Sequence, residues 1–135
     1  MREIRLLNAS KETDNKLRWE TRVEGAPFEL YIPKWRAPTP WPAKIIVHIE
    51  TDLESGKPWL IEKANQLPQD KYREQPIIAV VNRVREHTRT VRFDPDGDPD
   101  SWEIGSPYIP YELLDNEQAP QVLIRVMWDN SMAWS

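Results

Sequence analysis

The sequence predicts a mainly β fold of the α+β class: an antiparallel β-barrel or sandwich of about seven or eight strands, with one short helix between the fourth and fifth strands. Several segments alternate apolar and polar residues with the period of a strand, most cleanly over residues 17–24. Only residues 59–67 carry apolar side chains at helical spacing. The 13 prolines keep every element short, because proline interrupts both helices and central strands.

The first half of the chain is predicted to contain four strands. The first lies around residues 4–7, and the polar residues 8–16 are expected to form an exposed connection. Alternation over residues 17–32, interrupted by a turn, predicts a hairpin. Residues 33–42 hold four prolines, so they are expected to connect without a hydrogen-bonded ladder to a buried strand at residues 43–50.

The second half begins with the helix, which Pro58 suits as a first-turn residue and which Ser55 or Asp52 is expected to cap. Its other predicted elements are a short turn through residues 69–74, strands from residue 77 and around residues 91–93, a strand beginning at Trp102 and Ile104, a single helical turn closing residues 106–114, and a strand over residues 121–128. Trp134 is expected to dock on the body of the protein. All 135 residues are expected to form one domain.

Residues 83–92 are rich in arginine and form either one strand or the tip of a hairpin. In an unbroken strand, one face would carry a basic stripe of Arg83, Arg85, His87 and Arg89. We favour a hairpin that turns near residues 86–88 and gathers the arginines at its tip. The guanidinium fork suits carboxylates and phosphates, so these four are candidate ligand-binding residues. The favoured single explanation for the cluster is structural: Arg83, Arg85, Arg89 and Arg92 form ion pairs with Glu86 and with the acidic turn that follows.

Trp35 and Trp41, in the proline-rich connection, complete the predicted ligand-binding set. Large aromatic side chains usually bury for their area, so the favoured role is to pin this connection to the core. The alternative is an aromatic platform for a sugar, a base or a proline-rich peptide. His48 lies among apolar neighbours and is interpreted as a satisfied core residue, not a catalyst.

An acidic turn follows the arginine-rich segment, with carboxylates at Asp94, Asp96, Asp98 and Asp100. Calcium prefers several oxygen ligands at short range, so these four are the candidate metal ligands. The segment departs from the helix-flanked calcium loop, because Gly97 comes one place early and two prolines stiffen the loop. An ordinary solvated turn is therefore the favoured interpretation.

Composition narrows the possible functions. The chain has no cysteine, which excludes thiolate nucleophiles, disulfides and thiolate metal sites. A net charge of −4 argues against a surface that attracts nucleic acid as a whole. No secretory signal and no apolar run long enough to span a bilayer are found, so we expect a cytoplasmic protein without membrane contact.

The sequence supports a binding or interaction domain without evident catalytic machinery. We expect no enzyme, since no phosphate loop, nucleophile elbow or metal-binding histidine pair is present. Two alternatives stay open: anion or nucleic-acid binding through residues 83–92, and a carboxylate-based or calcium-dependent enzyme that uses residues 94–100. The expected partner is another protein or a second copy of the chain, contacted through exposed Trp and Tyr. No cofactor is expected, except Ca²⁺ at the acidic turn.

Overall fold

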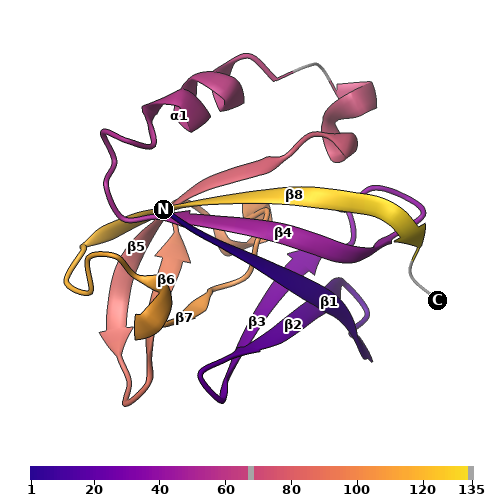
Figure 1. Cartoon of the computed structure of the whole chain (residues 1–135). Coiled ribbons are helices and arrows are strands. Elements are labelled where there is room, and N and C mark those ends of the chain that lie inside the picture. Colours follow the sequence, from indigo (N-terminus) through magenta and orange to yellow (C-terminus); the bar gives the residue numbers. More distant parts are fainter. Residues whose placement is uncertain (67–68, 134–135) are drawn as a thin grey trace.

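The computed structural model describes residues 1–66 and 69–133, and its eight antiparallel strands form one sheet that curls into a nearly closed barrel (Figure 1). The strand order is β3-β2-β1-β4-β8-β5-β6-β7. The strands are β1 (Arg2–Glu12), β2 (Lys16–Val23), β3 (Ala26–Pro33), β4 (Pro42–Glu50), β5 (Ile77–Glu86), β6 (Thr90–Pro95), β7 (Tyr108–Pro110) and β8 (Gln121–Ala133). The predicted class, the number of strands and the helix between β4 and β5 are confirmed. Trp134 lies outside the described residues.

The core fills the inside of the curled sheet. Alternate residues of each strand point inward, as the sequence pattern predicts, and Trp19, Phe28 and Phe93 are fully buried there. The indole of Trp19 donates a hydrogen bond to the Pro42 carbonyl at 3.0 Å, so its polar atom is satisfied inside the core. Strands β4 and β8 lie in the middle of the sheet order, which explains their almost continuous apolar character.

The barrel has a seam between its two edge strands, β3 and β7. The strands face each other, and near one end the amide of Gly105, in the segment before β7, donates to the Tyr31 carbonyl of β3 at 2.8 Å. No ladder pairs them in the described sheet. A hollow of about 350 Å³ opens along this seam, between the Tyr31 and Tyr108 side chains.

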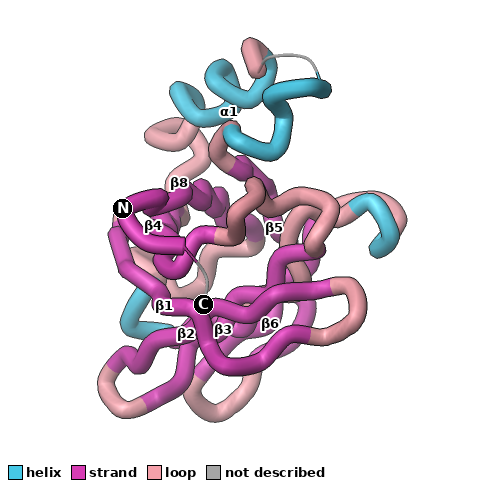
Figure 2. Tube along the Cα trace, turned by 90° about the vertical axis from the view of Figure 1, so that its right-hand side faces the viewer, coloured by secondary structure: helices cyan, strands magenta, loops and turns pink. Residues whose placement is uncertain are grey.

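One helix, α1 (Lys57–Ala64), lies outside the barrel above β5 and β8 (Figures 1 and 2). Pro58 occupies its first turn as predicted, but the predicted side-chain cap is wrong. Gly56 is the N-cap, and the Asp52 carboxylate instead accepts hydrogen bonds from the Glu54 amide and the Ser55 hydroxyl. The loop before the helix therefore satisfies its own polar groups.

Two strand boundaries differ from the prediction. Residues 8–12 belong to β1, which bulges between Asn8 and Glu12 and still pairs with β2, so the predicted exposed connection is wrong there. Residues 102–104 form no strand: η2 (Pro99–Ser101) ends just before them, and Ile104 alone enters the core. The next strand after η2 is β7, which begins at Tyr108. The expected helical turn, η3 (Tyr111–Leu113), follows it directly.

The short 3-10 helix η1 (Gln69–Glu74) occupies the predicted turn between α1 and β5. In the described part of the chain no helix has the length and apolar character needed to cross a membrane.

Candidate functional site

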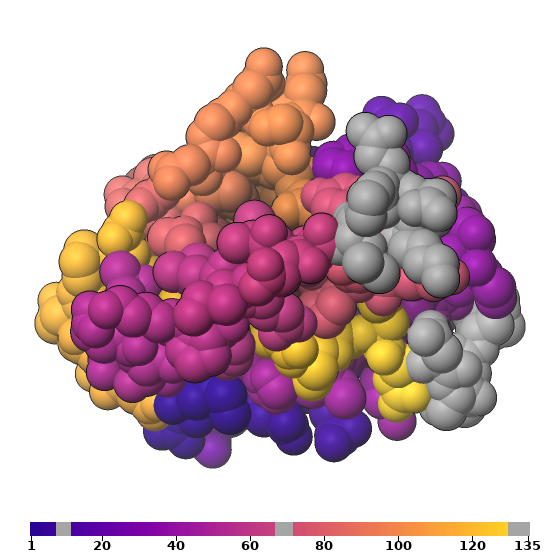
Figure 3. Space-filling view, turned by 90° about the horizontal axis from the view of Figure 1, so that it is seen from above, coloured from indigo at the N-terminus to yellow at the C-terminus, as the bar shows by residue number. Residues whose placement is uncertain are grey.

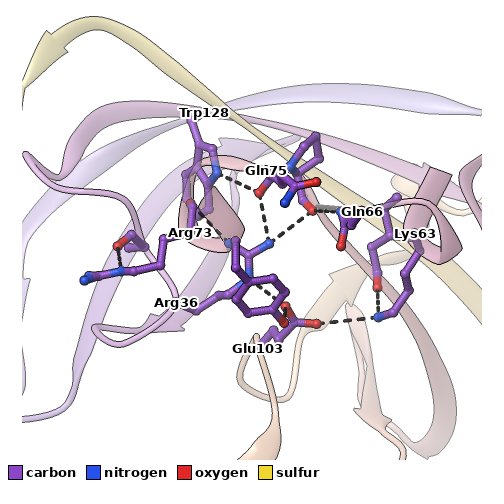
Figure 4. A network of polar contacts seen from close by, with 11 residues as sticks. Arg36, Lys63, Gln66, Arg73, Gln75, Glu103 and Trp128 are labelled. Carbon is purple, nitrogen blue, oxygen red and sulfur yellow. Dashed lines mark hydrogen bonds and ion pairs between the residues drawn. The ribbon is translucent and has the colours of Figure 1, made fainter. Parts of the chain in front are cut away.

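The most unusual side chain of the molecule is Arg36, a fully buried arginine in the connection between β3 and β4. The Arg36 amide donates to the Pro33 carbonyl, and the turn that this hydrogen bond closes directs Arg36 inward. Its guanidinium donates to the carbonyls of Arg73 (3.2 Å), Gln75 (2.9 Å) and Pro76 (3.1 Å) and to the Glu103 carboxylate (2.6 Å), as Figure 4 shows. A buried charge is tolerated only when it is paired in this way.

Glu103 is the counter-ion of Arg36 and comes from the irregular segment after η2. Its Oε1 accepts hydrogen bonds from Arg36 Nε and from the Tyr72 hydroxyl. The Arg36 guanidinium also lies over the Tyr72 ring, 4.4 Å from its centroid. The two donors on Oε1 fix the orientation of this carboxylate, and Oε2 accepts from neither of them.

The network sets the protonation states of its members. Burial alone would raise the pKa of the Glu103 carboxyl, but the hydrogen bonds from Tyr72 and Arg36 and the nearby positive charges hold that pKa below its ordinary value. Burial, and then the hydrogen bond to Glu103 and its charge, raise the pKa of Tyr72 to about 12. At neutral pH, Glu103 is therefore an anion and Tyr72 a neutral donor.

Further hydrogen bonds fasten the surrounding segments to this network. Arg73 donates to the carbonyls of Ala37 and Lys34, at 2.8 and 2.7 Å. The side chain of Gln66, just after α1, donates to the Pro76 carbonyl at 2.7 Å, and the indole of Trp128 in β8 donates to Gln75 at 3.1 Å. The connections on either side of η1 are thus held to one end of the barrel.

Lys63 of α1 closes the network on its outer side (Figure 4). Its ammonium donates to the Ile78 carbonyl at 2.6 Å and lies 3.5 Å from Glu103 Oε2. The Ile78 carbonyl can receive this contact because β6 pairs with β5 no further than Val81, opposite Pro95. The Lys63 side chain is 45% exposed, in contrast to the 16% of Glu103.

Two hollows meet at Trp102, next to Glu103. The first, of about 400 Å³, lies between α1, β5 and the segment after β6 and contains Lys63, Asp96 and Glu103. The second, of about 410 Å³, contains Trp35, the carboxylates of Asp14 and Asp100, and the ammonium groups of Lys16 and Lys34. In Figure 3 the orange segment around η2 stands beside the magenta helix, and the first hollow lies between them. We call the two hollows together the Trp102 groove.

The arginine-rich segment forms the predicted hairpin, and internal pairing accounts for part of it. Arg83 is paired with Glu86 at 2.9 Å and with the Glu117 carbonyl, and Arg92 with Asp94 at 3.0 Å. The guanidinium groups of Arg85 and Arg89 make no hydrogen bond or ion pair with the residues that the structure describes. They are exposed at the hairpin tip with His87, whose ring lies 5.4 Å from that of Tyr108.

The two predicted platform tryptophans occupy different environments. Trp41 is half-buried against the core, with the Lys34 ammonium 5.4 Å from its ring centroid, which agrees with a pinning role. Trp35 is 46% exposed and lines the Trp102 groove. Neither of the two hollows of this groove includes Arg83, Arg85, His87 or Arg89 in its lining. His48 Nε2 donates to the Glu3 carboxylate at 2.8 Å, and the imidazole ring stacks on Trp59 under α1.

The acidic turn has partners within the protein for three of its carboxylates. Asp94 binds Arg92, Asp96 accepts a hydrogen bond from Asn82 at 2.7 Å, and Asp98 caps η2 by accepting from the Asp100 amide. Among the described residues, no three His, Asp or Glu side chains are arranged to hold a metal ion. The calcium hypothesis stays a prediction, which a calorimetric titration with calcium checks.

Sequence reasoning missed the four residues at the centre of the site, Arg36, Lys63, Tyr72 and Glu103. Arg36 and Glu103 are 67 positions apart, and no motif spacing links them. The one local signal was Arg36 itself, an arginine inside the proline-rich connection of residues 33–42. Its buried position depends on carbonyls that only the folded chain brings together.

Searches of protein families, of curated proteins and of solved structures find no match to this chain.

Proposed function

We propose that this protein is a non-catalytic binding domain and that its ligand is an organic cation held in the Trp102 groove. The observation that carries the proposal is the fixed Glu103 carboxylate, which lines the hollow beside Trp102, with Oε1 saturated by two donors and Oε2 contacted by the partly exposed Lys63. The carboxylate itself need not reorient to receive a positive charge at Oε2, the oxygen that Lys63 approaches to 3.5 Å.

The protonation states support binding over acid-base chemistry. A general base works best with a pKa near the operating pH, and the pKa of Glu103 is displaced in the opposite direction. Tyr72, with a pKa raised to about 12, is a poor acid at neutral pH. At neutral pH the pair therefore keeps Glu103 ionised and Tyr72 neutral.

Charge and aromatic surface favour a cation over an anion. Asp96 and Glu103 provide two carboxylates in the hollow beside α1, where Lys63 provides one ammonium and the buried Arg36 is paired with Glu103. Trp102 lies between the two hollows, and an indole face attracts cations. The net charge of −4 adds a long-range attraction of the same sign.

Three probes of equal chain length test the proposal: hexylammonium, hexanol and hexanoate, each titrated while the indole N–H resonance of Trp102 is followed by NMR. Hexylammonium is expected to bind more tightly than hexanol, and hexanoate not to bind. Asp96→Asn should weaken hexylammonium binding, while Glu112→Gln, the same change at an exposed position on η3, should not. Equal binding of all three probes, or of none, would overturn the proposal.

Anion binding at the tip of the β5–β6 hairpin is a second candidate, favoured by the unpaired guanidinium groups of Arg85 and Arg89. Polyphosphate and a single-stranded oligonucleotide are suitable probes. The double variant R85A/R89A should abolish binding and leave the fold unchanged, because both side chains are exposed. Unaltered affinity in this variant would remove the candidate.

A further inference from the structure

Lys63 makes contacts that a ligand could make in its place. Its ammonium bridges two acceptors from distant parts of the chain, the Ile78 carbonyl and Glu103 Oε2. The first is a strand-edge carbonyl facing away from β8, beyond the last pair that joins β5 to β6. The second is the carboxylate oxygen that Arg36 and Tyr72 leave to Lys63, since both of them donate to the other oxygen, Oε1.

The helix that carries Lys63 is held to the sheet mainly by polar and aromatic contacts. No side chain of α1 is buried, and its contacts with the sheet are polar or aromatic at the surface: Glu62 with Arg125 at 2.8 Å, and Trp59 with His48. The Lys63 side chain is itself nearly half exposed. It can therefore turn into water, and the cost of doing so is mainly that of leaving its two acceptors unpaired.

We propose that the Ile78 carbonyl and Glu103 Oε2 form a subsite for the primary ammonium group of a ligand, and that Lys63 occupies this subsite until the ligand displaces it. The inference rests on the proposed function, since it names the chemical class of the cation and the position of its charged end. Binding is an exchange of one ammonium for another. The ligand's N–H groups restore both hydrogen bonds that Lys63 gives up, and its alkyl chain covers the apolar wall that Leu60, Ala79 and Ile104 provide.

This exchange makes an unusual prediction for Lys63→Met. Removing the internal competitor should raise the affinity for hexylammonium by about three- to tenfold, the range that corresponds to losing a partly exposed ion pair and its hydrogen bond. The control Lys57→Met makes the same change in net charge on the same helix, at a residue whose ammonium pairs with Glu54 at the surface, and should leave the affinity unchanged. Lys63→Arg, which keeps a competing cation, should show no gain.

A second probe separates the subsite from general cation binding at Trp102. Hexyltrimethylammonium carries the same charge as hexylammonium but has no N–H to donate. In Lys63→Met only the primary amine should gain affinity. A gain shared by both cations, or no gain with hexylammonium while the wild-type protein binds it, would overturn the subsite and leave the proposed function standing. If neither protein binds any cation, both proposals fail.

The ligand's ammonium could belong to a free alkylamine or to a lysine side chain of another protein, and one further probe distinguishes these sources. Nα-acetyl-lysine-N-methylamide has a free side-chain ammonium, and both ends of its main chain are blocked. Binding to Lys63→Met within about threefold of hexylammonium assigns the subsite to lysine in a protein. Much weaker binding, with hexylammonium still bound, assigns it to a free amine.

Discussion

Arg36 is stable inside the molecule because its donors have partners from four residues. Three of these are carbonyls around the start of β5, and the fourth is the Glu103 carboxylate. Removing one partner of a buried ion pair is costly, since the other charge stays desolvated and unpaired. A single side chain thus holds together the connection before β4, the entry to β5 and the segment after η2.

The change Arg36→Met tests this account. It removes the charge, retains a flexible apolar side chain, and takes one donor away from Glu103 and from each of three carbonyls. We expect it to lower the free energy of unfolding by about 3–5 kcal/mol. Urea denaturation measures the loss, and Arg85→Met, an exposed arginine without a partner among the described residues, should change stability by less than about 0.5 kcal/mol. Equal small effects would contradict the proposed role of Arg36.

Tyr72 makes stability depend on pH in the alkaline range. Its pKa in the folded protein is about 12, against an ordinary value of 10.0, so the folded state retains a proton that the unfolded state loses. The stability that Tyr72 contributes is complete below pH 10 and declines as the pH rises towards 12. Compared with Tyr72→Phe, the wild-type protein should therefore lose its advantage across this range. Denaturation of both proteins at several alkaline pH values measures the difference, and parallel curves would contradict it.

At the scale of elements, α1 covers the outer face of the sheet without burying any of its own side chains. Leu123 and Ile78 are buried on that face and lie outside the main core cluster. The loop before the helix can approach Leu123 closely because residue 56 is a glycine. The hydrophobic stripe predicted from the sequence is thus replaced by a contact in which the sheet supplies the apolar side chains.

Gly56→Ala should therefore destabilise the protein, although alanine favours helices more than glycine does. A Cβ atom at this position would lie well inside van der Waals contact with Leu123 Cδ1, and Leu123 is fully buried, so it has little room to move. We expect a loss of about 1–3 kcal/mol in the free energy of unfolding. Lys57→Ala, one residue further on and exposed, is the matched control. A stabilised Gly56→Ala would show that the loop is not closed onto the sheet.

The elements that the sequence predicted correctly are those with local signals. Alternation defined β2 and β3, and Pro58 marked the start of α1 within a residue or two. The wrong strand at residues 102–104 also followed from an apolar pattern. In the structure Ile104 is buried in the core, whereas Trp102 is only partly buried. The Gly105 amide donates to the Tyr31 carbonyl of β3, but this hydrogen bond is not part of a ladder.

The candidate site was less predictable than the fold because its residues are brought together only by the tertiary structure. Lys63 and Glu103 are 40 positions apart, and Tyr72 and Glu103 are 31 apart. Each is an ordinary residue type in its own segment. The arginines that did stand out in the sequence are partly paired with their neighbours, as a local charge run usually is.

At the scale of the whole molecule, the seam decides whether the sheet behaves as a closed barrel. The backbone of Tyr31 faces the seam, since its carbonyl accepts from Gly105, so every second residue of β3 also faces it. Two of these positions are Pro27 and Pro33, which have no N–H to donate. This pattern is typical of an edge strand and protects it against pairing with other chains.

Proline substitution at two glutamates that lie opposite each other tests the seam directly. Glu29 of β3 pairs with Glu20 of β2 in the register, and the amide of Glu29 points to the seam whereas that of Glu20 points to Leu7 of β1. Glu20→Pro removes a ladder hydrogen bond and should cost at least about 2–3 kcal/mol of unfolding free energy. Glu29→Pro removes no such bond and should cost less than about 1 kcal/mol. Urea denaturation compares the two, and equal losses would mean that β3 is hydrogen-bonded on both sides and that the barrel is closed.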